Sequence, residues 1–199
     1  MNKWTEKILP IWDKIGDLFF LNILYILCCI PIVTIGTATA ALYSLTLQMT
    51  EKKESYIAKA FLQNCKIHFK IATIIWLLFL LFICTFYFDY YYIGLLPSAP
   101  GYVFGILITV IFMILLCISS WLFPTISLCS ASVAHTLKSA CISCFSHPIQ
   151  SFIMLFMNCF FLGVLLFNLK LFFSLLPFIL IIGFSGVAYI NSKILRQCS

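Results

Sequence analysis

Few residues of this chain have the types and spacing that chemistry requires. Cys141, Cys144 and His147 follow one another at intervals of three residues, with His135 shortly before them. Thiolate and imidazole donors at such close spacing can bind zinc. The sequence has no second paired set of ligands, and its other cysteines are scattered through apolar segments, where a free thiol acts as a small hydrophobic side chain. We therefore expect no metal and no cofactor.

Asp89 is the only acidic residue after Glu54. An acid within a membrane can carry protons or bind a cation, and aromatic residues beside it could hold a sugar. Asp89 lies among tyrosines at the expected end of a membrane helix, where water reaches it, so we interpret it as an interfacial polar residue. The sequence contains no nucleotide-binding loop, nucleophile elbow or zinc-protease motif, and we expect no catalytic residue and no enzyme activity.

The chain contains five long stretches without Asp, Glu, Lys or Arg. The elements that these stretches form must position any functional site. The stretches cover residues 18–50, 71–88, 90–137, 139–169 and 171–192. About 20 apolar residues cross a bilayer core, and 63% of this chain is hydrophobic while 9% is charged. Lipid offers no partner to backbone polar groups, and the stretches lack the alternation of barrel strands. We predict an all-α, polytopic bundle of transmembrane helices.

The division into elements follows from proline, glycine and charge. Pro31 and Gly36 interrupt the first stretch, which is too long for one helix crossing. We expect one membrane domain over residues 1–199, with five to six membrane helices, six being preferred. The expected spans are about 18–33, 34–50, 71–91, 102–123, 148–167 and 171–191. Short amphipathic interfacial helices are expected at 1–17, 55–70 and 133–146, the last two on the inner face.

The distribution of cations selects the number of crossings. With six crossings and both termini in the cytoplasm, eleven of the twelve Lys and Arg residues lie inside and Lys170 lies outside, whereas five crossings give eight against four. A group of basic residues on the inner face would bind anionic lipid or an acidic partner, and we expect no nucleic acid. This group consists of Lys52, Lys53, Lys59, Lys66 and Lys70.

A run of small residues follows Pro31 and includes Thr34, Gly36, Ala38, Thr39 and Ala40. Small residues let membrane helices approach closely, and threonine can form hydrogen bonds across the contact, so helix packing is the first interpretation. The alternative is a broken-helix binding site, in which backbone groups freed around Pro31 and Gly36 line a cavity.

The stretch from Leu21 to Trp76 resembles the YesL-like family of bacterial membrane proteins, a family of unknown biochemical function. The shared pattern is an LN pair followed by P-x-V-T-I-G-x-A-T-A-A-L. Its residues here include Asn22, Pro31, Thr34, Gly36, Ala38, Thr39 and Ala40. The chain departs from the family at Thr37, where proline is usual, and at His68, where asparagine is frequent. The resemblance implies a multi-span protein of the bacterial cytoplasmic (inner) membrane. Members of the family tend to be encoded beside carbohydrate uptake transporters and two-component regulators, which suggests an accessory role in sugar uptake or sensing.

Two functions follow as expectations. The first is a non-enzymatic accessory protein in carbohydrate uptake or sensing, with a sugar transporter permease or a sensor kinase as its partner within the lipid bilayer. The alternative is a small transporter or channel for a neutral solute, centred on the break at Pro31–Gly36. The absence of charged residues from the middle of the expected spans argues against an ion-coupled carrier.

Overall fold

The computed structural model describes residues 5–50, 56–94, 99–128, 132–167, 174, 177 and 179–198, and no β-strand occurs among them. The expected all-α class is confirmed. The elements in chain order are α1 (Thr5–Cys29), the 3₁₀ turn η1 (Ile32–Thr34), α2 (Ile35–Thr50), α3 (Ile57–Gly94), α4 (Ala99–Leu128), α5 (Val133–Ser146), α6 (Pro148–Phe167), the π-helical turn η2 (Ile179–Gly183) and α8 (Phe184–Cys198).

Two of these helices each join segments that the sequence pattern divides. The helix α1 continues through the boundary between the interfacial segment 1–17 and the span 18–33. The helix α3 likewise continues from the amphipathic segment 55–70 into the span 71–91. A change from amphipathic to apolar composition alters what a helix contacts but does not end it, because the backbone hydrogen bonds of a helix do not depend on which side chains face water or lipid.

Three helical segments are long and apolar enough to cross a membrane, judged by length and composition within the described residues. They are Ile32–Thr50, Ile57–Gly94 and Val103–Leu128, and the bent pair Val133–Ser146 with Pro148–Asn158 would make a fourth. This count is below the five to six crossings expected from the sequence. Part of the difference lies in the expected last span, 171–191, much of which falls outside the described residues.

A sharp bend separates α5 from α6, at the boundary that the sequence predicts between the segments 133–146 and 148–167. The two helices meet at 108° around His147. Pro148 disfavours the helical conformation at the residue before it, while its own fixed φ suits the first position of a new helix. At the other end of α5, the Ser132 side chain caps the helix by accepting a hydrogen bond from the backbone N–H of His135 at 3.4 Å.

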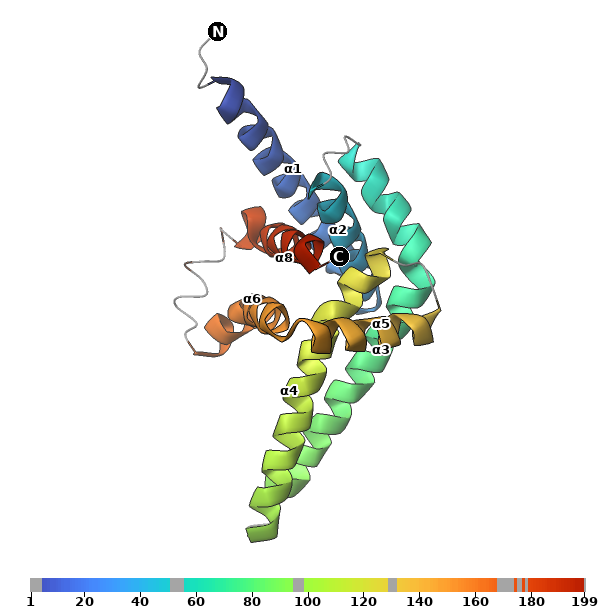
Figure 1. Cartoon of the computed structure of the whole chain (residues 1–199), viewed down its shortest axis with the longest axis vertical. Coiled ribbons are helices and arrows are strands. Elements are labelled where there is room, and N and C mark those ends of the chain that lie inside the picture. The colour runs from blue at the N-terminus through green and yellow to red at the C-terminus, as the bar shows by residue number, and fades with distance from the viewer. Residues whose placement is uncertain are drawn as a thin grey trace.

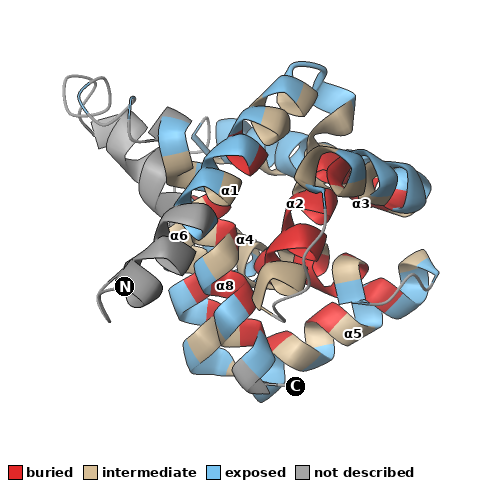
Figure 2. Cartoon of the chain, turned by 90° about the horizontal axis from the view of Figure 1, so that it is seen from above, coloured by how far each residue is buried: buried red, intermediate tan, exposed pale blue. Residues whose placement is uncertain are grey.

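The helix α2 is the centre of the fold. Ten of its sixteen residues are buried, from Gly36 to Thr46. Ala40 belongs to one apolar cluster with Trp121 and Ile126 of α4, whereas Ala38 and Ala41 belong to a second cluster with Leu21 of α1. Figure 2 shows the buried colour gathered on α2. Small side chains make this central position possible, because they allow several helices to approach the same axis.

The distal halves of α3 and α4 extend away from this centre as a two-helix hairpin (Figure 1). Its outer surface is apolar and exposed, with Leu81 at 63% and Ile106 at 66% of their full accessibility. Phe86 joins the two helices, with its ring centroid 4.8 Å from that of Phe112. The residues from Ile71 to Gly94 extend about 36 Å at about 1.5 Å per residue, enough to cross a bilayer core of about 30 Å.

Candidate functional site at the break between α1 and α2

The break at Pro31 is built by residues that replace the lost helical hydrogen bonds. Pro31 is extended, with φ −78° and ψ 124°, and the turn η1 follows directly. The hydroxyl of Thr34 lies 2.6 Å from the carbonyl oxygen of Cys28 and 2.8 Å from that of Pro31. Carbonyl groups at a helix C-terminus lack partners within the helix, so Thr34, the last residue of η1, caps the end of α1.

Gly36 sets the distance between α2 and α3. A Cβ atom at this position would lie 2.5 Å from Cβ of Trp76 and 2.7 Å from the carbonyl oxygen of Ala72. Two hydrogen bonds hold the same contact. Thr37 and Thr73 share one between their hydroxyl groups at 3.0 Å, and Trp76 Nε1 donates to the carbonyl oxygen of Ile32 at 2.8 Å. The helix α3 thus closes over the break and satisfies one of its backbone carbonyls.

The remaining small residues of the motif pack α2 against its neighbours. Ala38 and Ala40 are almost fully buried, at 1% and 0% exposure. Thr39 donates to the carbonyl oxygen of Ile35 at 2.7 Å, and its hydroxyl oxygen lies 3.4 Å from the hydroxyl of Tyr25 on α1. The structure therefore brings Pro31, Thr34, Gly36 and the residues after them into one region.

Asn22 lies apart from this region and docks α8. Its Oδ1 accepts a hydrogen bond from the backbone N–H of Ser185 at 3.1 Å, and the hydroxyl of Ser185 donates to the carbonyl oxygen of Leu18 at 2.8 Å. Ser185 is the second residue of α8, which begins directly after the π-helical turn η2. A π-helical turn disturbs the regular hydrogen-bond ladder of a helix, so an amide oxygen at this point supplies a replacement acceptor.

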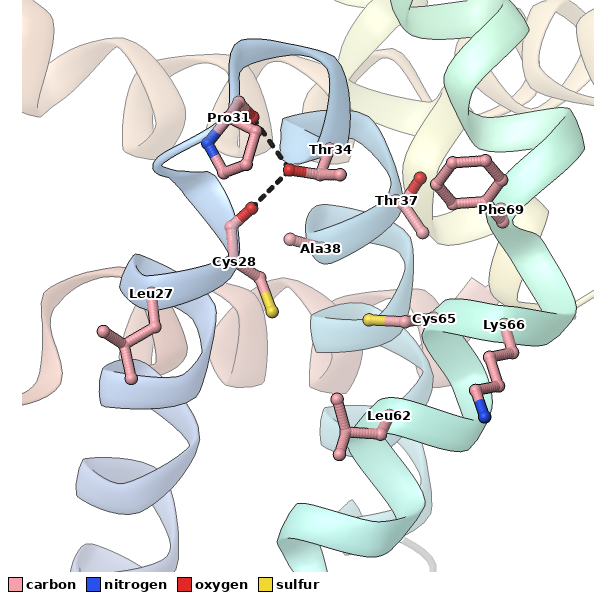
Figure 3. Close-up of a pocket in the computed structure, with 10 residues that line it drawn as sticks. All are labelled: Leu27, Cys28, Pro31, Thr34, Thr37, Ala38, Leu62, Cys65, Lys66 and Phe69. Carbon is pink, nitrogen blue, oxygen red and sulfur yellow. Dashed lines mark hydrogen bonds between the residues drawn. The ribbon is translucent and has the colours of Figure 1, made fainter.

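A pocket of about 590 Å³ opens between α1, α2 and α3 at the break (Figure 3). The lining side chains are Leu27, Cys28, Pro31, Thr34, Thr37, Ala38, Leu62, Cys65, Lys66 and Phe69. Figure 3 shows the sulfur atoms of Cys28 and Cys65 directed toward each other across it. Leu27, Leu62 and Phe69 are half-exposed, so the pocket is open to the surroundings of the chain.

The polar groups of the pocket wall are already engaged. Thr34 uses its hydroxyl hydrogen within the turn, and Thr37 is paired with Thr73. Lys66 is the single charged residue among the described residues that line the pocket. The wall therefore offers apolar contact and one cation, but few of the free donors and acceptors that a polyhydroxylated ligand requires.

The basic group expected on the inner face is described in part. Lys59, Lys66 and Lys70 are exposed on the proximal half of α3, while Lys52 and Lys53 lie outside the described residues. The buried face of this half runs through Phe61 and His68 rather than through Phe69, which is 50% exposed. The face of α3 that α2 covers therefore lies beside the apolar face predicted from the sequence spacing and does not coincide with it.

The candidate metal ligands do not assemble into a site. Cys144 belongs to the cluster around α4, and the ring of His147 stacks on Trp121 at 6.3 Å between centroids. Within the described part of the chain, no three His, Cys, Asp or Glu side chains come together in a way that could hold a metal ion. Asp89 is exposed near the distal end of α3.

Sequence reasoning missed a buried polar seam that attaches α8 to α2. Asn191 Nδ2 donates to the hydroxyl of Tyr43 at 3.0 Å and lies 3.5 Å from Oδ1 of Asn158. Thr46 and Ser192 share a hydrogen bond between their hydroxyl groups at 2.7 Å. The signal in the sequence was the pair Asn191–Ser192 at the end of an otherwise apolar stretch, since polar residues in such stretches commonly face another helix.

Comparison with known proteins gives one match. No curated protein and no solved structure matches the chain. A family model described as "Protein of unknown function, DUF624" matches residues 18–90, which extend from the second half of α1 through the break and α2 into the distal half of α3. The region that carries the break, the small-residue motif and the pocket is therefore the region in which this chain is similar to that family of unknown function.

Proposed function

We propose that this chain is an integral membrane protein without catalytic activity, which acts as an accessory to carbohydrate uptake or sensing. It does so by contacting a transporter permease or a sensor kinase within the bilayer. The carbohydrate assignment rests on the resemblance of Leu21–Trp76 to the YesL-like family. The mode of action rests on the exposed α3–α4 hairpin.

The hairpin is the single structural observation that supports contact with a partner in the membrane. Two packed helices bury only the sides that face each other, and the outer sides here expose large apolar groups along their length. Exposed apolar patches larger than a few hundred Å² normally contact lipid or another protein. A group of tyrosines lies at the distal end of α3. The amphipathic side chain of tyrosine prefers the membrane–water interface. The members of this group are Tyr87, Tyr90, Tyr91 and Tyr92, each at least 60% exposed.

Cross-linking from the hairpin tests the accessory role. A photoreactive amino acid at Leu107, which is 53% exposed, should capture a permease or a sensor kinase in cells of the native bacterium. The same probe at Phe152, 69% exposed on α6 and outside the hairpin, serves as the matched comparison. Capture of the same protein with equal yield from both positions, or of lipid alone from Leu107, would contradict contact through the hairpin.

The alternative, a passive route for a neutral solute at the break, has the position of the pocket in its favour. The chemistry of the wall does not favour a sugar, because each sugar hydroxyl that enters without a partner carries a desolvation penalty of about 1–3 kcal/mol. Sugar uptake in cells and sugar flux in liposomes separate the two functions. An accessory protein lowers cellular uptake when deleted but gives no flux when purified and reconstituted alone, whereas flux without a partner would favour the transporter.

A further inference from the structure

The pocket at the break has the composition of a lipid-chain site. Seven of its ten lining residues are Leu, Cys, Pro, Ala or Phe, and the two threonines are engaged within the protein. Its volume of about 590 Å³ lies within the usual range of ligand pockets, about 300–1,000 Å³. The half-exposed rim of Leu27, Leu62 and Phe69 gives an apolar entrance. An apolar chain fits such a cavity without leaving polar atoms unpaired.

The lysines at the rim of the pocket indicate the charge of the ligand's head group. Lys66 lines the pocket, and Lys59 and Lys70 are exposed on the same half of α3. A lysine extends its apolar stem along a surface and keeps its ammonium group in a polar layer. An apolar cavity with an ammonium group beside it is complementary to an amphiphile that has an anionic head group.

We propose that the pocket between α1, α2 and α3 binds one acyl chain of an anionic phospholipid, whose phosphate contacts Lys66. The proposal is independent of the accessory role. Moving an acyl chain from the bilayer into an apolar pocket changes its surroundings little, so the chain contributes little selectivity. The head-group charge decides which lipid is retained, and one lysine near an anionic surface corresponds to about a fivefold preference.

The two pocket cysteines report occupancy directly. The purified full-length chain is stripped of lipid in detergent, supplied with dioleoylphosphatidylglycerol or dioleoylphosphatidylcholine, and treated with N-ethylmaleimide. Labelling of each cysteine is then measured by peptide mass spectrometry. Phosphatidylglycerol should protect Cys28 and Cys65 at about fivefold lower concentration than phosphatidylcholine. Cys84, exposed on α3 beyond the pocket, is the internal control and should be labelled equally in all samples.

Two variants separate the head group from the chain. Lys66→Gln should remove the preference for phosphatidylglycerol while leaving weak protection by either lipid, and Lys59→Gln, an exposed lysine that does not line the pocket, should keep the preference. Leu62→Trp adds volume at the half-exposed rim and should abolish protection by both lipids. Unchanged melting temperatures in detergent confirm that the variants are folded.

Several results would overturn the proposal. Equal labelling of Cys28 and Cys65 with and without lipid means that no chain enters the pocket. Equal protection by both lipids in the unmodified chain means that the lysine does not select the head group. Protection without lipid in a dimeric fraction means that a second copy covers the pocket. Protection by glycerol 3-phosphate alone means that the site recognises the phosphate and not the chain.

Discussion

At position 36 the side chain is a single hydrogen atom, and this allows α2 to lie against α3. We expect Gly36→Ala to lower the free energy of unfolding by about 1–3 kcal/mol, the usual cost of overpacking a close contact. The reason is that the new methyl group would lie 2.5 Å from Cβ of Trp76 and 2.7 Å from a backbone oxygen, neither of which can move without shifting α3. Unfolding in mixed micelles measures the change.

Gly16→Ala is the matched control, because it adds the same methyl group to a helix where nothing lies within 4 Å. Alanine is a better helix former than glycine by about 1 kcal/mol, so this variant should be neutral or slightly more stable. Equal stability of the two variants would show that the α2–α3 contact is looser than its geometry indicates.

Asn22 is the motif residue whose role extends furthest along the chain. We expect Asn22→Leu to leave the buried N–H of Ser185 without its side-chain acceptor, at a cost of about 1–3 kcal/mol. Amide hydrogen exchange should become faster at Ser185 and in the first turn of α8. Ser44→Ala, which removes the hydrogen bond from Ser44 to Asn64 between α2 and α3, is the comparison and should leave exchange at Ser185 unchanged. Identical exchange in both variants would contradict the docking role of Asn22.

At the scale of elements, the α3–α4 hairpin has an exposed apolar surface that favours lipid over water. Leu107→Lys places a charge on an exposed apolar side of α4, where membrane insertion should become less favourable by about 3 kcal/mol. Gln63→Lys adds the same charge to the proximal half of α3, beside Lys59 and Lys66, and should insert normally. Glycosylation mapping in microsomes measures the inserted fraction. Normal insertion of Leu107→Lys would mean that this side of α4 does not face lipid.

The sequence predicts best the helices whose ends are marked by a proline or glycine. The spacing of apolar residues and the proline at 148 mark the junction between α5 and α6, and Pro31 with Gly36 marks the break after α1. The direction of α6 could not be predicted, because the 108° bend depends on the conformation of His147 and on packing against Trp121. Tertiary contacts of this kind leave no periodic signal in a single sequence.

The sequence predicts where the candidate site lies but not which side chains come together around its pocket. Proline, glycine and small residues indicate a break near Pro31–Gly36 and a close helix contact there. The approach of Cys28 to Cys65 across a cavity depends on how α3 crosses α2, which the hydrogen bonds Thr37–Thr73 and Ser44–Asn64 define. The apolar stripe of the 55–70 segment marks only approximately the side that becomes buried, because the exposed Phe69 follows the same spacing as the buried Phe61.

At the scale of the whole molecule, the distribution of charge is the property that orients the chain in a membrane. Its net charge is +6, and the described lysines of α3 are exposed at the proximal end, away from the tyrosines of the distal end. Cations near the ends of membrane helices favour the cytoplasmic side and so determine orientation. A change in their number should therefore act on the orientation of the chain as a whole.

We expect replacement of the five basic residues by glutamine to give a mixed or inverted orientation in the membrane, because this removes all the cations between the first and second apolar stretches. These residues are Lys52, Lys53, Lys59, Lys66 and Lys70. A reporter fused to the C-terminus and active on only one side of the membrane measures the orientation. Lys170→Gln, which removes the one cation expected outside, is the control and should leave the reporter cytoplasmic. An unchanged signal in the fivefold variant would mean that helix packing rather than charge orients the chain, and the inner-face assignment of these lysines would be lost with it.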